Sequence, residues 1–450
     1  MAGRTNSRKR RPAQPAEPGI SGLTVAGFKS IRDEQSIEIR PLTLLAGANS
    51  SGKSSFMQPL LLLKQTLEAS YDPGPLRLDG PNVRLTDMRQ VLARSAGARR
   101  GNGFQVGMGL GSFGRLLLSF GRQAKGEVQL SRMIAIDSEQ EITLTPGMSE
   151  EEIEKQLAEY VGPAKDLFTV SVTLKRERCF LLPVVTLEEG PTAVWLSFPR
   201  EVISAAELLI RRVIHVPGLR GNPERTYHVT AVGDTYPGTF QEYVASVVYQ
   251  WQTAEKSGSL EALAADLQEL GLTSSVAARR VSDVHVELQV GRLARATSRA
   301  SRDLVSIADV GLGVSQVLPV LVALHVATPR HLVYLEQPAL HLHPRAQVAL
   351  AWVLARAVKR GVRMVVETHS PLLLLAIQAL VAAGKEGLTR DMVKLHWFTR
   401  SEKDGTSKIT SADLDEAGSF GDWPEDFGAV TLDVEKEYLD AAERVWRRKK

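Results

Sequence analysis

An α/β fold built on a central parallel sheet is predicted from the sequence by three observations. A glycine-rich loop at residues 47–54 lies between an apolar run and a helical pattern. After about residue 280, short apolar runs alternate with helical patterns, which is the rhythm of a parallel sheet. Between these regions, short segments of alternating hydrophobicity predict a β-rich lobe and an inserted α+β region.

The glycine-rich loop has the spacing of a phosphate-binding loop. Its sequence GANSSGKS fits G-x-x-x-x-G-K-[ST] between a strand at 42–46 and a helix at 54–69. Backbone N–H groups and the helix N-terminus can surround phosphate oxygens. Lys53 offers a charge to the β- and γ-phosphates, and Ser54 offers a hydroxyl ligand to Mg²⁺. The pattern therefore predicts a P-loop that binds ATP through Gly47, Asn49, Ser50, Ser51, Gly52, Lys53, Ser54 and Ser55; a turn that binds nothing is the alternative.

Composition limits the class of protein. The chain has 450 residues, of which 43% are apolar and 24% charged, as in a globular protein of more than one domain. Its single cysteine, Cys179, excludes an intramolecular disulfide, and no Cys/His cluster has zinc-site spacing. No apolar run is long enough to span a bilayer. We therefore expect a cytoplasmic protein that does not contact membranes.

The net charge of +4 comes from the two ends. Residues 1–19 and residues 447–450 each carry a net charge of +4, so residues 20–446 carry −4. Nucleic acid could contact such tails without sequence specificity. The Pro and Arg content of residues 1–18 instead favours a solvated, disordered tail.

The pattern divides the chain into four parts. A disordered basic tail (1–18) precedes the first part of the nucleotide-binding core (19–120), an inserted α+β region (121–279) and the second part of the core (280–450). In the last part we expect helices at 314–326, 344–359, 371–382 and 432–448, and strands at 331–335, 363–367 and 393–399. No sustained heptads occur, so long coiled-coil arms are not expected.

Candidate chemical groups follow two of these strands. Glu336 ends an apolar strand, where P-loop enzymes hold the Mg²⁺ ligand. Glu367 ends the next strand and His369 follows it, where a histidine can contact the γ-phosphate or the attacking water. His341 and His343 have the spacing of a metal pair, but no third ligand is apparent.

In order, the segments GANSSGKSS, DVGLGVSQ, YLEQPALHLHP and ETHS resemble ABC-type ATPases related to SMC proteins, RecF and the OLD nucleases. The set is most similar to bacterial AAA-type ATPases of phage defence, such as those of the Septu and PARIS systems. The resemblance covers roughly residues 20–90 and 280–400, and implies an ABC/SMC-like ATPase head.

The resemblance also implies roles for individual residues. Glu336 takes the Walker B position of a Mg²⁺ ligand, and His369 the switch position. Gly313, Ser315 and Gln316 occupy the signature region, which in this superfamily touches the γ-phosphate held by a partner. A head-to-head homodimer with two ATP molecules between the heads is implied. Most relatives carry a second carboxylate after the Walker B acid, but this chain has Gln337, which cannot accept a proton.

The sequence therefore leaves open whether ATP is hydrolysed, and Glu367 could replace the missing base. The first hypothesis is a slowly hydrolysing ATPase that acts as sensor or scaffold and controls a separately encoded effector, such as a nuclease, in anti-phage defence. The second is a DNA-stimulated ATPase of recombination and repair. A self-contained OLD-type nuclease would need acids such as Asp413, Asp415 and Glu416 on successive strand ends. A loop with Arg220 and Arg225 could bind phosphate or be structural.

Overall fold

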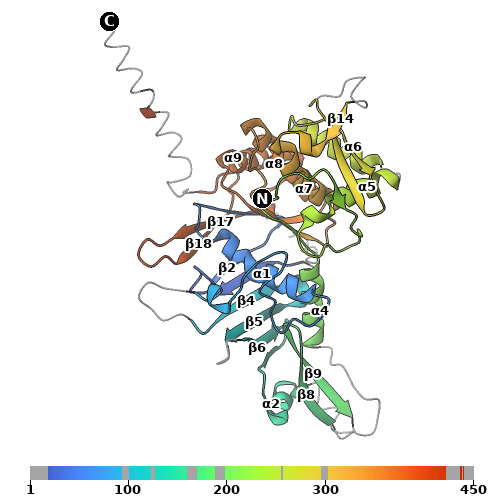
Figure 1. Ribbon diagram of the computed structural model, residues 1–450. Coiled ribbons are helices and arrows are strands. Elements are labelled where there is room, and N and C mark those ends of the chain that lie inside the picture. Colours follow the sequence, from blue (N-terminus) through green and yellow to red (C-terminus); the bar gives the residue numbers. More distant parts are fainter. Residues whose placement is uncertain are drawn as a thin grey trace, which may run out of the picture.

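The computed structural model describes residues 19–93, 101–122, 127–159, 170–187, 198–254, 257–294 and 303–421, together with 436, 437 and 439. Two six-stranded sheets dominate these parts of the chain. Figure 1 shows the head, with α7, α8 and α9, in the upper half and a β-rich lobe below it. Within the described residues, no helix has the length and apolar character needed to cross a membrane.

The head sheet has the strand order β10-β15-β16-β3-β17-β18. The first five strands are parallel, and β18 pairs antiparallel with β17. Their carboxyl ends therefore meet at one edge, where the phosphate loop leaves β3. The strands are β3 (Leu42–Gly47), β10 (Val213–Val216), β15 (Leu332–Glu336), β16 (Arg363–Glu367), β17 (Val393–Arg400) and β18 (Ser407–Ala412).

Both faces of the head sheet are buried. Alternate residues of β3 belong to different cores: Leu44 packs with the helices of the head, and Leu45 packs toward α1 and the lobe. This alternation is expected for a strand covered on both sides. The covering helices are α1 (Lys53–Leu67), α7 (Leu312–Val326), α8 (Pro344–Lys359) and α9 (Pro371–Ala382).

The lobe is an antiparallel sheet in the order β2-β1-β4-β5-β6-β7. A hairpin, β8–β9, extends from it at the bottom of Figure 1, with α2 beside it. Helix α4 joins the lobe to the head because it contacts α1, β5 and β6. The elements are β1 (Gly22–Ala26), β2 (Gln35–Glu38), β4 (Gly103–Gly109), β5 (Arg115–Arg122), β6 (Val128–Ile136), β7 (Glu141–Leu144), α2 (Glu150–Gln156), β8 (Val170–Glu177), β9 (Phe180–Leu187) and α4 (Arg200–Arg211).

A smaller sheet and two helices complete the head. Its strands β11, β12, β13 and β14 pair antiparallel, and α5 packs on β12 and β13. The elements are β11 (Tyr227–His228), α5 (Val244–Thr253), α6 (Ser257–Glu269), β12 (Val276–Arg280), β13 (His285–Gly291) and β14 (Leu304–Ser306).

The predicted fold class is confirmed: an α/β P-loop ATPase head of the ABC/SMC-like type with a β-rich lobe. Sheet pairing crosses both predicted boundaries of the inserted region, however. Strands β6 and β7 extend the lobe sheet beyond residue 120, and β10 enters the head sheet beside β15. The segment 121–279 is therefore shared between lobe and head, because its strands find their partners in both. The predicted tail at 1–18 and nearly all of the predicted helix at 432–448 lie outside the described residues.

Candidate nucleotide site

The phosphate loop turns sharply between β3 and α1. Gly47 has φ 135° and Gly52 has φ 106°, values that favour glycine. A Cβ on Gly47 would lie 2.2 Å from the Phe398 carbonyl oxygen, and one on Gly52 would lie 2.4 Å from Ser407 Oγ. Both glycines are therefore required by backbone conformation and by close packing against the β17–β18 hairpin.

Lys53 is buried under this loop with its amine directed at the loop's own backbone. Its Nζ donates to the carbonyls of Gly47 (3.0 Å) and Ala48 (2.8 Å). Burial lowers the pKa of Lys53 to about 8, although the nearby Glu367 carboxylate opposes the shift. The same nitrogen also lies 3.3 Å from the Ser51 hydroxyl oxygen. These hydrogen-bond partners are all uncharged, which suits the ammonium to receive an anionic phosphate.

Ser54 contacts the carboxylate of Glu367 rather than that of Glu336. Its Oγ lies 2.9 Å from both carboxylate oxygens of Glu367, and the Tyr334 hydroxyl donates to Oε2 of the same group at 3.0 Å. Burial and the neighbouring charge of Glu336 raise the pKa of Glu367. The Ser54 hydroxyl at the start of α1 and the Glu367 carboxylate at the end of β16 therefore lie together, and a hard cation prefers such oxygen ligands.

Glu336 is held by β10, the strand that pairs with β15, and by the loop that follows β10. His215 Nε2 lies 3.1 Å from Oε1, and the Gly218 backbone N–H donates to Oε2 at 3.0 Å. Asn82 Nδ2 donates to His215 Nδ1 at 3.0 Å. Nε2 therefore carries the ring hydrogen and donates it in a hydrogen bond to the Glu336 carboxylate. Burial raises the pKa of Glu336, but these hydrogen bonds outweigh it and the net shift is downward.

A cavity of about 800 Å³ opens over the phosphate loop. Gln337, Glu367 and His369 line it together with the loop, whereas Glu336 does not. Burial and the charge of Lys53 lower the pKa of His369, which favours the neutral imidazole. The predicted roles of these four residues stay predictions, but only three of them face the cavity.

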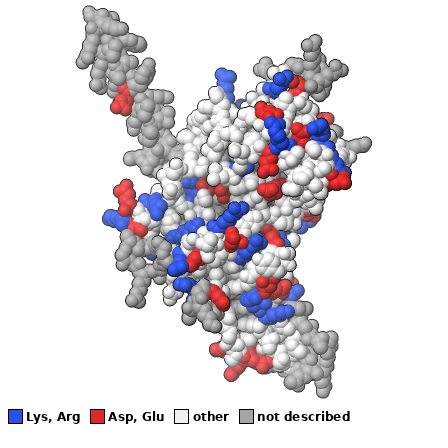
Figure 2. Space-filling view, in the orientation of Figure 1, with Lys and Arg blue, Asp and Glu red and all other residues white. Residues whose placement is uncertain are grey.

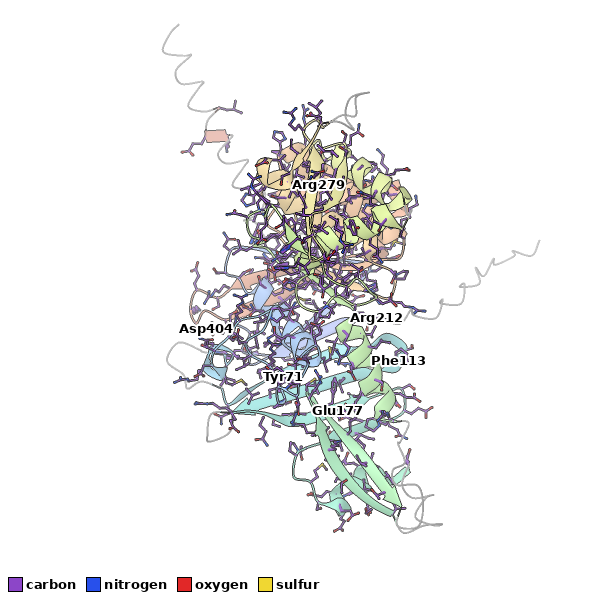
Figure 3. All side chains as sticks on the ribbon, turned by 45° about the vertical axis from the view of Figure 1, so that its right-hand side comes forward. Tyr71, Phe113, Glu177, Arg212, Arg279 and Asp404 are labelled. Atoms are coloured by element: carbon purple, nitrogen blue, oxygen red, sulfur yellow. The ribbon has the colours of Figure 1, made fainter. Side chains whose placement is uncertain are left out.

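Eight further residues line this cavity, and the sequence did not identify them as site residues. They come from the lobe and from the β17–β18 turn, where Asp404 is labelled in Figure 3. Ser407 Oγ also donates to the Ser51 carbonyl at 2.6 Å and so fastens the phosphate loop. The GFKS segment at 27–30 was the only available signal, and it suggests no more than a turn. The added lining residues are Lys29, Ser30, Arg89, Gln90, Leu92, Arg400, Asp404 and Gly405.

The predicted signature region, at the start of α7, is largely buried. Ser315 and Gln316 are 9% and 6% exposed; the Ser315 hydroxyl donates to the Leu312 carbonyl, and the Gln316 amide donates to the Gly221 carbonyl. Leu312 is 45% exposed. A Cβ on Gly313 would lie 3.9 Å from the His341 carbonyl oxygen, so the start of α7 lies beside the loop that follows β15.

The remaining candidates have partners of other kinds. His343 caps α8 by accepting from the Arg345 N–H, and the described residues contain no group of three or more His, Cys, Asp or Glu that could hold a metal. Asp413 pairs with Lys394 at 2.8 Å, and Asp415 accepts from backbone N–H groups of its own turn. These acids satisfy local donors and do not converge on a nuclease centre.

The two arginines of the candidate phosphate loop differ. Arg220 is 8% exposed and bonds to backbone carbonyls, whereas Arg225 forms an exposed ion pair with Asp309 at 2.8 Å. Both guanidinium groups therefore have partners within the chain, which favours the structural alternative. Cys179 is fully buried, and burial raises the pKa of its thiol well above the ordinary value.

The phosphate loop and the order of the head strands give this part of the chain the fold of a P-loop ATPase head. The matching family model covers residues 232–376 and is described as "AAA domain, putative AbiEii toxin, Type IV TA system". That range contains the signature segment, Glu336, Gln337, Glu367 and His369. No curated protein matches the chain.

Three solved SMC head structures are similar to this chain. An SMC head bound to the C-winged helix domain of ScpA has 13% identity and a TM-score of 0.49, and the match covers 89% of this chain and 99% of that one. The SMC head domain from Thermotoga maritima has 11% identity and a TM-score of 0.41, over 88% and 100%. An SMC head with an extended coiled coil, bound to the C-terminal domain of ScpA from Pyrococcus furiosus, has 12% identity and a TM-score of 0.47, over 88% and 96%.

Proposed function

We propose that this protein binds ATP and Mg²⁺, hydrolyses ATP slowly and associates head to head, as a sensor or scaffold that controls an effector in DNA-linked anti-phage defence. The observation that carries the proposal is the cavity over the phosphate loop, which Lys53 and Gln337 both line. The resemblance assigns Gln337 to the position of the usual general base. The volume of the cavity lies within the range of about 300–1,000 Å³ common for ligand sites.

The residues present fit a magnesium ion. Ser54 and Glu367 supply oxygen donors within 2.9 Å of each other, and Mg²⁺ usually takes only one or two protein ligands besides phosphate and water. When bound, Mg²⁺ would neutralise charge on the β- and γ-phosphates. Ser54 and Glu367 would hold the metal, and Glu336 would not be a direct ligand, because His215 and Gly218 already hold the Glu336 carboxylate.

Slow hydrolysis follows from the side chain at position 337. An amide cannot accept the proton of an attacking water, and loss of a general base costs about 10²–10⁴ in rate. From an ordinary turnover of about 10 s⁻¹, we expect less than about 0.1 s⁻¹. Gln337→Glu should raise this rate. Brisk turnover by the wild type that vanishes in Lys53→Ala would contradict the proposal.

The metal assignment is tested by comparing two conservative variants. Binding of Mn²⁺ in the presence of a non-hydrolysable ATP analogue can be followed by electron paramagnetic resonance. We expect Glu367→Gln to weaken Mn²⁺ binding about 10–100-fold and Glu336→Gln to weaken it less than about threefold. The reverse ranking would return the role of metal ligand to Glu336.

Association of two heads is supported by the exposed start of α7 beside the loop after β15. Sedimentation velocity with ATP and Mg²⁺ should give twice the monomer mass. Leu312→Asp should abolish this change, because Leu312 lies on the proposed contact face. Leu208→Asp is a matched control on α4, where Leu208 is 48% exposed compared with 45% for Leu312. An equal mass with and without nucleotide would contradict dimerisation.

The effector and the biological setting rest on the resemblance and on the family description. Cells that carry this gene with its neighbours should resist phage, and Lys53→Ala should remove the resistance. Equal plaque counts for the wild type and the variant would contradict the defence role.

A DNA-stimulated repair ATPase is the second candidate. On the face shown in Figure 2, Lys and Arg lie interspersed with Asp and Glu over the described surface. This mixture disfavours a broad DNA-binding surface on that face. Turnover that rises severalfold on addition of DNA would favour repair.

A further inference from the structure

The segment between β10 and β11, residues 217–225, contacts two separate parts of the nucleotide region; we call it the bridging loop. Its Gly218 N–H donates to the Glu336 carboxylate at 3.0 Å, at the end of β15. Its Gly221 carbonyl accepts from the Gln316 amide at 2.8 Å, in the first turns of α7. The loop therefore joins the turn that follows β15 to the helix that carries the signature segment.

Arg220 makes the most direct of these connections. One terminal nitrogen donates to the Glu336 carbonyl at 2.8 Å and to the Gln337 carbonyl at 3.3 Å. The other donates to the Gln316 carbonyl at 2.9 Å. Because a guanidinium is planar and rigid, these bonds fix the separation of the two segments. Burial lowers the pKa of Arg220 to about 10, so the group remains charged at neutral pH.

The turn that Arg220 holds is strained. Gln337 has φ 46°, in the left-handed region that is unfavourable for a residue other than glycine. Its N–H donates to the Glu367 carbonyl at 2.8 Å, and its carbonyl also accepts from the Leu340 N–H at 3.1 Å. Such a conformation persists only when surrounding contacts fix it, and Arg220 supplies the contact from the bridging loop.

We propose that Arg220 is a positioning residue that keeps Gln337 in the nucleotide cavity. It also holds this turn and the start of α7 together, so that the two segments move as one. A shift of the Gln337 turn then moves the signature segment of the same chain. The first statement concerns the fold alone. The second, that ATP causes such a shift, rests on the proposed function.

Hydrogen exchange of the full chain without nucleotide tests the first statement. Arg220→Lys keeps the charge but cannot span three carbonyls in a fixed plane. We expect about tenfold faster exchange in peptides covering 312–320 and 336–342, and less than about twofold change elsewhere. Arg225→Lys, in the same loop but in an exposed pair, should leave both peptides within about twofold. A uniform increase across the chain, an increase in one peptide only, or no increase would overturn the proposal.

A second arm adds ATP and Mg²⁺. In the wild type, exchange should slow in both peptides, and in Arg220→Lys it should slow only in 336–342. Slowing of both peptides in the variant would overturn the coupling. Absence of any ATP effect in the wild type would instead contradict the proposed nucleotide function, while the nucleotide-free comparison would still decide the role of Arg220.

Discussion

His396 makes the stability of the head depend on pH in a predictable direction. It lies on β17 beside the phosphate-loop strand and is fully buried. Nε2 lies 2.8 Å from the Glu38 carbonyl and Nδ1 lies 2.8 Å from the Ser411 hydroxyl, so Nε2 carries the proton of a neutral imidazole. Burial lowers the pKa to about 4 despite the Glu38 carbonyl, and the charges of Lys394 and Arg40 assist.

Between the ordinary value of 6.5 and about 4, the unfolded chain binds more protons at this position than the folded chain. Stability is therefore lost as pH falls through that window. At pH 5 the expected loss from this histidine is about 2 kcal/mol relative to pH 7.5. Acidification should loosen the contact between β17 and the lobe strand that carries Glu38.

Urea unfolding followed by tryptophan fluorescence at pH 7.5 and pH 5 measures this effect. His396→Gln keeps a neutral hydrogen-bonding side chain and does not titrate. The wild type should lose about 2 kcal/mol more than this variant between the two pH values, because other groups titrate equally in both. Equal losses in the two proteins would refute the assignment of the effect to His396.

Two further predictions concern stability. Gly47→Ala should cost about 3 kcal/mol in thermal unfolding and reduce ATP binding, because its Cβ would meet the Phe398 carbonyl at 2.2 Å at a positive φ. Gly233→Ala, with nothing within 4 Å, should stay within about 0.5 kcal/mol, and an equal cost would contradict the steric argument. Lys64 in the last turn of α1 and Glu68, its C-cap residue, form an ion pair that is largely buried, so Lys64→Met should cost about 3–5 kcal/mol in urea unfolding. The double variant Lys64→Met/Glu68→Leu should recover part of that loss, whereas an equal loss in both would show that the unpaired carboxylate is not its source.

Local signals located the elements of the second half well. The predicted helices at 344–359 and 371–382 and the strand at 363–367 agree with the bounds of α8, α9 and β16. Both helices start with proline after a capping side chain, which marks an N-terminus strongly. Helix α7 begins at Leu312, two residues earlier than predicted, because Gly311 is its N-cap.

The pairing of strands that are distant in the chain could not be predicted from the sequence. Strand β10 has only four residues, all buried, and so shows no periodicity; β18 depends on β17 for its partner. The approach of Glu367 to Ser54 depends on which strand lies next to β3. The contact between His215 and Glu336 depends on which strand lies next to β15. Strand order is a property of the whole sheet, so the sequence predicts a metal ligand at Glu336 but cannot show that Glu367 lies beside Ser54.

The position of β3 also determines when the nucleotide site can exist. This strand lies between β16 and β17, although more than three hundred residues separate it from them in the chain. During synthesis the phosphate loop emerges more than three hundred residues before the two strands that hold its backbone. Until those strands are synthesised, β3 stays an apolar strand without its partners, and such a strand can associate with other chains. A ribosome that stops before β16 would release a lobe with a phosphate loop but no site for ATP.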